Sequence, residues 1–360
     1  MKNQKIHIGY VQFYVHDATE SSKYFVKVFG CETLAKVSSG QTKTEIIYRD
    51  SLIFIFTSPL DSDNPVADFL RNHPPGIVDL AFVVQDIQSV MEKAYKLGIH
   101  IRSPLQICQY PQGSLQWSQI NIGGTLRHTL IERSGVTPLL PPTLEWQDLS
   151  WLPCFTENKN KLKEKLVGID HVAIAIASDN FETIIELYKQ IFDLIGTEEY
   201  NIETPSSGMQ GQVLASSEKE LQLVLVHPTS NNSPIQEILQ INKGLGVHHL
   251  ALLTNNILEI VSELRFRGLE FIKIPQNYYQ KIHSRYQKLF VESHELIKII
   301  QLEILLEILE NNSQQMLLQA FTEPIFSQGN FVFELIERRH QAQGFGERNF
   351  RDLYEAIEQK

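Results

Sequence analysis

The chain has 360 residues, of which 42% are hydrophobic and 21% are charged, and its net charge is −10. These values are typical of a globular protein long enough for two domains, and the acidic balance excludes a basic nucleic-acid-binding surface. The start, MKNQKIHIGY, has no signal-peptide hydrophobic region, no apolar run is long enough for a bilayer, and the cysteines are scattered (Cys31, Cys108 and Cys154). We therefore expect a cytoplasmic protein without a disulfide framework, a nucleic-acid partner or a membrane partner.

Runs of β-branched and aromatic residues predict strands, and amphipathic segments between them predict helices. In the first half the strands are GYVQFYV, EIIYR, LIFIFT, VDLAFVV and INIGG, and the helices are ATESSKYFVKVFG and DIQSVMEKAYKLG. In the second half the strands are HVAIAIA, GQVLAS, LQLVLVH, HHLALLT and FELIER, and the helices are NFETIIELYKQIF and NILEIVSELRFRG. One strand, one helix and several strands recur four times, which predicts an α+β fold of tandem βαβββ modules.

A break in this pattern predicts the domain division. Prolines at 138, 141, 142 and 153 precede the charged stretch ENKNKLKEK, and such clusters resist regular structure. We expect an N-terminal domain over 1–140, a linker over 141–165 and a C-terminal domain over 166–360, each domain curling a mixed sheet into an open barrel. Further on, LIKIIQLEILLEIL (Leu296 to Leu309) predicts a helix that passes into a hairpin, with QMLLQAF as a strand.

The two halves are a tandem duplication. GVHHLALLTNNI (Gly246 to Ile257) repeats GIVDLAFVVQDI (Gly76 to Ile87) at an offset of 170 residues, and the glycines that end the next helices, Gly98 and Gly268, keep this offset. IDHVAIAIA likewise matches IGYVQFYVH, and FELIERR matches HTLIERS. The residues that differ between matched strands should therefore identify the chemistry that one half has and the other lacks.

Three matched strand positions differ in this way. The first half carries Tyr10, Asp79 and Thr129, and the second half carries His171, His249 and Glu334. Two imidazoles and one carboxylate from separate strands form a 2-His-1-carboxylate iron site, which leaves positions open for substrate and oxygen. We therefore predict a metal site in the C-terminal domain and none in the N-terminal domain. Taken singly, His171 also fits a structural histidine, and Glu334 fits an ion pair with Arg338.

His248 competes with His249 as the second histidine ligand. Successive side chains of a strand point to opposite faces, so only one of the two is expected to face the site. The repeat selects His249, because its partner Asp79 is the polar residue of an otherwise apolar strand.

The second half resembles 4-hydroxyphenylpyruvate dioxygenase, a family of the vicinal-oxygen-chelate superfamily. The resemblance rests on GIDHVAIAI, SGMQGQVLAS, GVHHLAL, RGLEFIKIPQNYY, MLLQAFTEPIF, FVFELIERR and GFGERNFRDLYEAIE, and more weakly on HPPG (His73 to Gly76) in the first half. It implies the glyoxalase-like form of the βαβββ fold, Fe(2+) held by His171, His249 and Glu334, and a homodimer or homotetramer. It also implies a small-molecule 2-oxo acid as substrate together with O2, loss of carbon dioxide and hydroxylation of the remainder.

The resemblance also implies a substrate pocket and a gate. Ser207, Gln319, Phe321 and Phe345 match positions that line the family's pocket. The helix from Asn349 to Gln359, together with Phe345, resembles the family's gate, and its predicted apolar stripe consists of Phe350, Leu353, Tyr354 and Ile357. The competing interpretations are that Phe321 and Phe345 only pack in the core and that the helix is permanently docked.

Three departures from the family leave the substrate open. Val226 stands where the family has asparagine, Pro234 stands where it has glutamine, and His248 stands where it has the glutamine before the second ligand histidine. A site that loses its hydrogen-bonding partner for a hydroxyl loses much of its discrimination. The alternatives are formation of homogentisate from 4-hydroxyphenylpyruvate, hydroxymandelate-synthase-like chemistry or another 2-oxo acid such as phenylpyruvate or an aliphatic one, and a non-catalytic small-molecule-binding protein.

Overall fold

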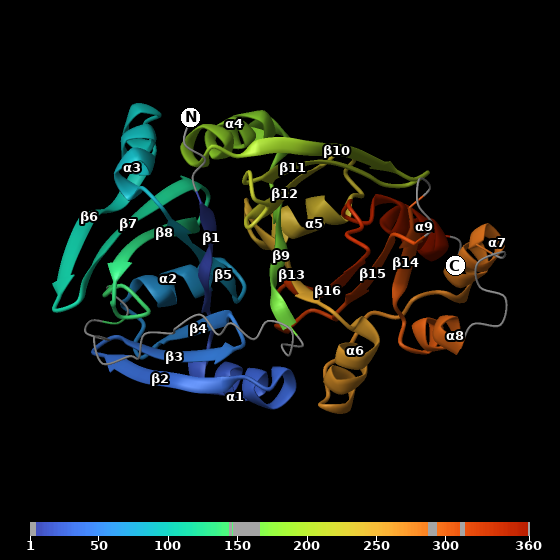
Figure 1. The fold of residues 1–360 in the computed structure, drawn as a ribbon, viewed down its shortest axis with the longest axis horizontal. Helices are drawn as coiled ribbons and strands as arrows, with labels where there is room; N and C mark the ends of the chain where they lie inside the picture. The colour runs from blue at the N-terminus through green and yellow to red at the C-terminus, as the bar shows by residue number, and fades with distance from the viewer. Residues whose placement is uncertain (1–4, 144–145, 147–165, 287–293, 310–313, 359–360) are drawn as a thin grey trace.

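The computed structural model describes residues 5–143, 146, 166–286, 294–309 and 314–358. Each half of the chain builds one eight-stranded sheet, and the two sheets curl side by side (Figure 1). The N-terminal half contains β1 (Ile6–Tyr14), α1 (Ala18–Phe29), β2 (Glu32–Ser39), β3 (Thr42–Arg49), β4 (Leu52–Pro59), α2 (Pro65–Asn72), β5 (Gly76–Val84), α3 (Ile87–Lys96), β6 (His100–Tyr110), β7 (Gly113–Gly123) and β8 (Leu126–Gly135).

The C-terminal half repeats this order and adds helices. It contains β9 (Leu166–Ala175), a 3-10 turn (Ser178–Asn180), α4 (Phe181–Phe192), β10 (Ile195–Glu203), β11 (Gly208–Ala215), β12 (Gln222–Pro228), α5 (Pro234–Ile241), β13 (Gly246–Thr254), α6 (Ile257–Phe266), α7 (Gln276–Tyr286), α8 (His294–Gln301), β14 (Leu305–Ile308), β15 (Met316–Phe321), β16 (Val332–Arg339) and α9 (Glu347–Glu358).

The strand order confirms the tandem βαβββ modules. The N-terminal sheet runs β2-β3-β4-β1-β5-β8-β7-β6, and the C-terminal sheet runs β10-β11-β12-β9-β13-β16-β15-β14. In each sheet the two modules join through their first strands, β1 with β5 and β9 with β13, which pair antiparallel. Within each module the first strand pairs parallel with the last strand, as β13 does with β16. The centre of each sheet is therefore formed by the first and last strands of its two modules.

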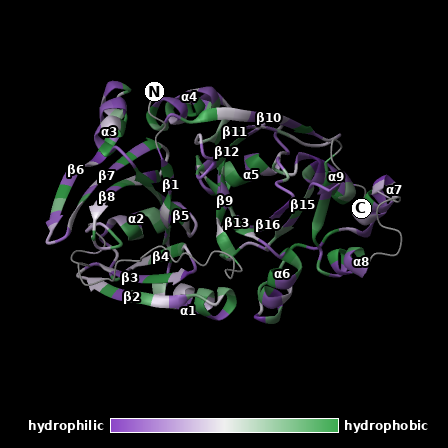
Figure 2. Ribbon diagram, in the orientation of Figure 1, coloured by the Kyte–Doolittle hydropathy of each residue, from purple (hydrophilic) through white to green (hydrophobic). Residues whose placement is uncertain are grey.

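The duplication extends to the helix caps. Asp86 begins α3 by accepting a hydrogen bond from the backbone N–H of Ser89, and Asn256 begins α6 in the same way with Glu259. Such caps satisfy backbone donors that have no partner within the helix. In Figure 2 both helices carry hydrophobic and hydrophilic residues, which fits their position on the outside of the sheets.

One hydrophobic core runs through both halves. Phe13 on β1 packs against Phe331, the residue before β16, with ring centroids 5.4 Å apart. Phe25 on α1 packs against Phe333 on β16, with ring centroids 5.8 Å apart. Burying these rings removes a large apolar area from water, at roughly 25 cal/mol per Å². The same hydrophobic cluster therefore stabilises each half and holds the two halves together.

The predicted helix over Leu296–Leu309 is wrong beyond its second turn. Helix α8 ends at Gln301, Glu303 takes a left-handed conformation (φ 56°), and Leu305–Ile308 form the edge strand β14. Pairing with β15 and burial of Leu305 and Leu306 outweigh the helix propensity of this segment. Of the predicted linker, only 141–143 and 146 lie in the described part of the chain, so the domain boundaries stay a prediction. Every helix in the described ranges is too short or too polar to cross a bilayer.

Candidate metal centre

Three central strands of the C-terminal sheet bring His171, His249 and Glu334 together. The strands are β9, β13 and β16, and the register sets Ala251 opposite both His171 and Glu334. The Nε2 atoms of the two histidines are 3.2 Å apart, and Glu334 Oε2 lies 3.2 Å from His171 Nε2 and 3.3 Å from His249 Nε2. The three residues, separated by up to 163 positions in the sequence, thus each bring one potential ligand atom to the same place.

The geometry fits a bound metal ion. Metal–ligand bonds of about 2.1 Å place neighbouring ligand atoms roughly 3.0–3.4 Å apart, depending on the coordination angle. Glu334 is fully buried, and its Oε1 accepts a hydrogen bond from the Gln319 amide at 2.9 Å, whereas its Oε2 has no hydrogen-bond partner. A buried carboxylate oxygen without a partner is costly, and a cation bound there would remove that cost.

The electrostatics of the three residues favour a cation. Burial opposes the charged form of His171, but the carboxylates of Glu334 and Asp170 raise its pKa to about 9. Burial, and then the neighbouring His248 and His171, hold the pKa of His249 well below its usual value. His249 is therefore neutral, the form that binds a metal, and the carboxylates attract positive charge to the space between the ligands.

Asp170 and Arg338 orient His171, the first candidate ligand. Asp170 accepts a hydrogen bond from His171 Nδ1 at 2.8 Å, which leaves Nε2 free to face the other ligands. Arg338 donates two hydrogen bonds to Asp170, each 2.7 Å long, and donates others to the carbonyls of Ala342 and Gly344. Arg338 thus pairs with Asp170 and not with Glu334, which removes the ion-pair interpretation of Glu334.

His248 and His249 both line the cavity, so the expectation that only one of them faces the site is wrong. The register between β13 and β9 slips here, because Val247 pairs with Ile174 and His249 pairs with Ala173, the next residue back along β9. His248 is the extra residue of a β-bulge, and bulges re-aim side chains next to functional sites. The Nδ1 atoms of the two histidines are 3.1 Å apart, and burial lowers the pKa of His248 to about 4.

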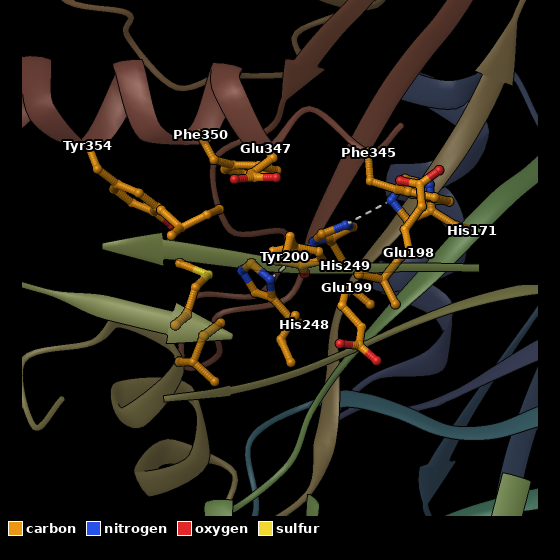
Figure 3. Close-up of a pocket in the computed structure, with 16 residues that line it drawn as sticks. His171, Glu198, Glu199, Tyr200, His248, His249, Phe345, Glu347, Phe350 and Tyr354 are labelled. Carbon is orange, nitrogen blue, oxygen red and sulfur yellow. Dashed lines mark hydrogen bonds between the residues drawn. The ribbon is translucent and has the colours of Figure 1, made fainter. Parts of the chain in front are cut away.

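The cavity beside His171 and His249 is mostly apolar (Figure 3). Its walls are formed by His171, Ala173, Glu198, Glu199, Tyr200, Ile202, Met209, Val224, Val226, Ile235, His248, His249, Phe345, Glu347, Phe350 and Tyr354. Of the predicted substrate contacts, Val226, His248 and Phe345 are among them. Gln319 and Phe321 lie one layer behind, because Gln319 contacts Glu334 and the Phe321 ring packs on His249 at 5.9 Å.

The two remaining predicted contacts lie elsewhere. Ser207 sits in the turn between β10 and β11, where its backbone N–H donates to Thr204 Oγ1, and Pro234 opens α5 and leaves its neighbour Ile235 to line the cavity. The sequence reasoning missed Tyr200 and the role of β10. Glu198, Tyr200 and Ile202 alternate with more exposed residues along this strand, and this period of two was the available signal.

Helix α9 covers one side of the cavity with Phe350 and Tyr354, and Phe345 before it packs on the His171 ring with centroids 5.0 Å apart. The predicted apolar stripe is wrong at its end, because Ile357 is 48% exposed, one turn beyond the cavity. The helix is anchored by Arg285, which forms two hydrogen bonds with Asp352.

The N-terminal sheet holds a guanidinium at the position matched to the metal centre. Asp79 accepts hydrogen bonds from Arg127 Nε at 3.2 Å, from the Thr129 hydroxyl at 2.5 Å and from the Thr129 backbone N–H at 2.9 Å. The same Arg127 donates to Tyr14 at 2.8 Å and Gln12 at 2.7 Å. A buried cation, hydrogen-bonded through each of its three nitrogens, thus occupies the space between strands that the C-terminal half leaves to its three candidate ligands.

Comparisons with known proteins agree with this site and fold. Residues 170–286 match the Glyoxalase/Bleomycin resistance protein/Dioxygenase superfamily. The chain is 30% identical over 366 residues to the 4-hydroxyphenylpyruvate dioxygenase of Dictyostelium discoideum, covering 98% of this chain and 97% of that one. It is 30% identical over 385 residues to the enzyme of that name from Coccidioides posadasii, covering 99% and 94% of the two chains, and 34% identical over 355 residues to an uncharacterized Synechocystis protein, covering 97% and 96%.

Among solved structures, a triple mutant of 4-hydroxymandelate synthase from Streptomyces coelicolor superimposes with a TM-score of 0.79 at 23% identity, covering 100% of this chain and 99% of that one. At this identity the likeness shows the fold alone. Fold and site together define a vicinal-oxygen-chelate enzyme, a dioxygenase in which one cluster of the described residues could hold a metal ion. By its full-length similarity to named members, the chain belongs to the 4-hydroxyphenylpyruvate dioxygenase family.

Proposed function

We propose that the protein is an Fe(II)-dependent 2-oxo acid dioxygenase that converts 4-hydroxyphenylpyruvate and O2 to homogentisate and CO2. The observation that carries the proposal is the buried face of His171, His249 and Glu334, with an unpartnered Glu334 Oε2. Such a face suits non-haem iron, which would supply the redox chemistry and the positions where the 2-oxo acid and oxygen meet. One oxygen atom enters the new carboxylate and the other enters the ring.

The chain's own residues orient the reactants and exclude water. Phe345, Phe350 and Met209 line the cavity with apolar surface, which strengthens electrostatic interactions inside it. Asp170 fixes the ring of His171, and Gln319 fixes the carboxylate of Glu334, so the ligand face needs no rearrangement when iron binds.

Tyr200 and Tyr354 favour a hydroxylated substrate over a purely apolar one. Both line the cavity, and burial raises the pKa of Tyr354 to about 12 and that of Tyr200 further, so both phenols stay protonated and can donate hydrogen bonds. They supply polar groups that Val226 and Pro234 do not. The rival proposal is hydroxylation of the side chain, or a less polar 2-oxo acid such as phenylpyruvate, and Val226, which lines the cavity and is 4% exposed, is the observation that favours it.

Oxygen consumption and product analysis test these proposals. The iron-loaded protein should consume oxygen with 4-hydroxyphenylpyruvate and release homogentisate and CO2 in equal amounts. His249→Ala should abolish both iron retention and oxygen uptake. A faster reaction with phenylpyruvate or an aliphatic 2-oxo acid, or a mandelate product, would favour the rival. No turnover of any 2-oxo acid would leave a binding protein as the remaining function.

A further inference from the structure

The floor of the cavity is formed by small and apolar residues of three neighbouring strands. They are Met209, Gly211 and Val213 on β11, Val224 and Val226 on β12, and Ala173 and Ala175 on β9. None of their side chains can donate a hydrogen bond. A donor that lies over this floor therefore has to come from another element.

Tyr200 reaches over the floor from the edge strand β10. The register sets Tyr200 opposite Gly211, and Gly211 opposite Val226. A Cβ atom at Gly211 would lie 2.3 Å from Cζ of Tyr200 and 2.5 Å from its hydroxyl oxygen. The end of the phenol ring thus lies directly on the backbone of β11, at the cavity that Tyr200 helps to line (Figure 3).

The ring of Tyr200, and not the backbone, explains the glycine at position 211. Gly211 is not among the glycines with positive φ, so other residues can adopt its conformation. Glycine inside a strand weakens the sheet and often marks a place where another group approaches closely. Here the approaching group is the phenol, and any side chain at 211 would displace it.

The hydroxyl of Tyr200 is an unused donor. No described residue forms a hydrogen bond with it. Burial is the main cause that raises the pKa of Tyr200 above its usual value, and the phenol of Tyr354 adds to the effect, so the hydroxyl keeps its proton at neutral pH. In a mostly apolar cavity, such a donor favours a ligand that places an oxygen beside it.

The position of this hydroxyl selects the far end of a ligand. In the sheet order β11-β12-β9, Gly211 is two strands from β9, roughly 10 Å at about 4.8 Å per strand. Through Val226 it is aligned with Ala175, two residues along β9 from Ala173, the partner of His249. A 2-oxo acid bound at the candidate ligands would therefore bring the opposite end of its aromatic ring, and not its carboxylate, toward Tyr200.

We infer that Tyr200 and Gly211 form a specificity pair for an aryl 2-oxo acid with a ring hydroxyl, in which Gly211 lets the phenol lie across β11 and Tyr200 donates a hydrogen bond to the ring oxygen. This inference rests on the proposed function for the identity of the substrate. The competing interpretation is that the ring of Tyr200 only covers the glycine. Tyr200→Phe separates the two, because it keeps the ring and removes the hydroxyl.

The preference for 4-hydroxyphenylpyruvate over phenylpyruvate tests the pair. It is measured by calorimetric titration of the Fe(II)-saturated protein in the absence of oxygen. Tyr200→Phe should lower the preference about 3-fold to 10-fold, the effect of one neutral hydrogen bond. Gly211→Ala should lower it by a similar factor, because the methyl group displaces the phenol. Gly196→Ala is the matched control, since a Cβ there first meets the end of the Gln212 side chain, at 3.0 Å, and it should keep the wild-type preference.

A double variant moves the hydroxyl from β10 to β11. In Tyr200→Ala/Gly211→Ser the serine hydroxyl lies near the place that the tyrosine hydroxyl leaves, because the Cβ at 211 is 2.5 Å from that place. This variant should recover most of the preference, whereas Tyr200→Ala/Gly211→Ala should not. Neither double variant contains the clash of Gly211→Ala, so the test stands even if thermal unfolding shows that the single variant misfolds.

An undiminished preference in Tyr200→Phe, or equal affinity of the wild type for the two acids, would overturn the inference. If the wild type binds neither acid, the proposed function fails. The pair is then tested with 4-hydroxyphenylacetate and phenylacetate, which carry no 2-oxo group. The wild type should prefer the hydroxylated acid and Tyr200→Phe should not, and an equal preference in both proteins would contradict the pair.

Discussion

At the scale of single residues, the described part of each half contains a buried ion pair, but only the C-terminal pair contacts a candidate metal ligand. Arg338 and Asp170 hold His171 in the C-terminal half, and Arg127 and Asp79 fill the N-terminal sheet. Burial raises the pKa of Asp79, whereas the hydrogen bonds from Arg338 and His171 outweigh burial and lower the pKa of Asp170 below its usual value. The Arg338–Asp170 pair is therefore held more strongly as ions than the Arg127–Asp79 pair.

Asp170→Asn should weaken the metal site and the fold together. The substitution leaves a buried arginine without its carboxylate, which costs about 3 kcal/mol of unfolding free energy, and it loosens His171, which costs about 10-fold to 100-fold in Fe(II) affinity. Asp79→Asn is the matched control, with a similar loss of stability and unchanged Fe(II) affinity. Chemical denaturation and Fe(II) titration measure the two quantities. Equal Fe(II) affinity in both variants would contradict a role for Asp170 in holding the ligand.

At the scale of elements, helix α9 reaches the metal centre through a chain of amides. Asn349 on α9 donates to Gln319 Oε1 at 2.7 Å, and Gln319 donates to Glu334 at 2.9 Å and to the Phe345 carbonyl at 3.2 Å. The segment before the helix contains two glycines at positive φ, 92° for Gly344 and 78° for Gly346. A Cβ at Gly346 would collide with the Gln319 amide, whereas a Cβ at Gly344 would meet open space.

These two glycines test whether the helix controls the reaction. Alanine strains the backbone at either position, at roughly 1–2 kcal/mol. Only Gly346→Ala should also displace Gln319 from Glu334, so it should lower the ratio of hydroxylated product to released CO2 and raise the Fe(II) dissociation constant. Gly344→Ala should keep the wild-type ratio. If both variants keep it, α9 is a docked part of the core and not a gate.

The sequence allowed prediction of the strands and of the three candidate ligands, because a duplication exposes positions that differ between otherwise similar strands. It did not allow prediction of the bulge at His248, since a bulge depends on the register between two strands and not on either strand alone. The helix predicted through Leu309 failed for a related reason. Residues Leu305–Ile308 favour a helix locally but are needed to complete a sheet whose other strands come from elsewhere in the chain. Neither the register of the strands at His248 nor the pairing of β14 with β15 can be predicted from the neighbouring residues in the sequence.

At the scale of the whole molecule, a histidine of one half is held by a residue of the other. His128 on β8 is fully buried, its Nδ1 donates to the Leu80 carbonyl at 3.0 Å, and its Nε2 accepts from the Tyr188 hydroxyl on α4 at 2.8 Å. The ring also stacks on Phe82, with centroids 4.5 Å apart. Both ring nitrogens are thus satisfied by the neutral form, and burial lowers the pKa of His128 to about 4.

The stability of the protein should therefore fall on mild acidification. The folded pKa of about 4 lies below the unfolded value of about 6.5, so the unfolded chain takes up a proton first, and the stability that is present above pH 6.5 is lost as the pH falls toward 4. This group alone should remove about 2 kcal/mol of unfolding free energy between pH 7 and pH 5. His128→Asn should be less stable at pH 7 but should lose less stability over that interval. Urea denaturation at the two pH values measures the difference, and an equal loss in wild type and variant would show that His128 does not couple folding to protons.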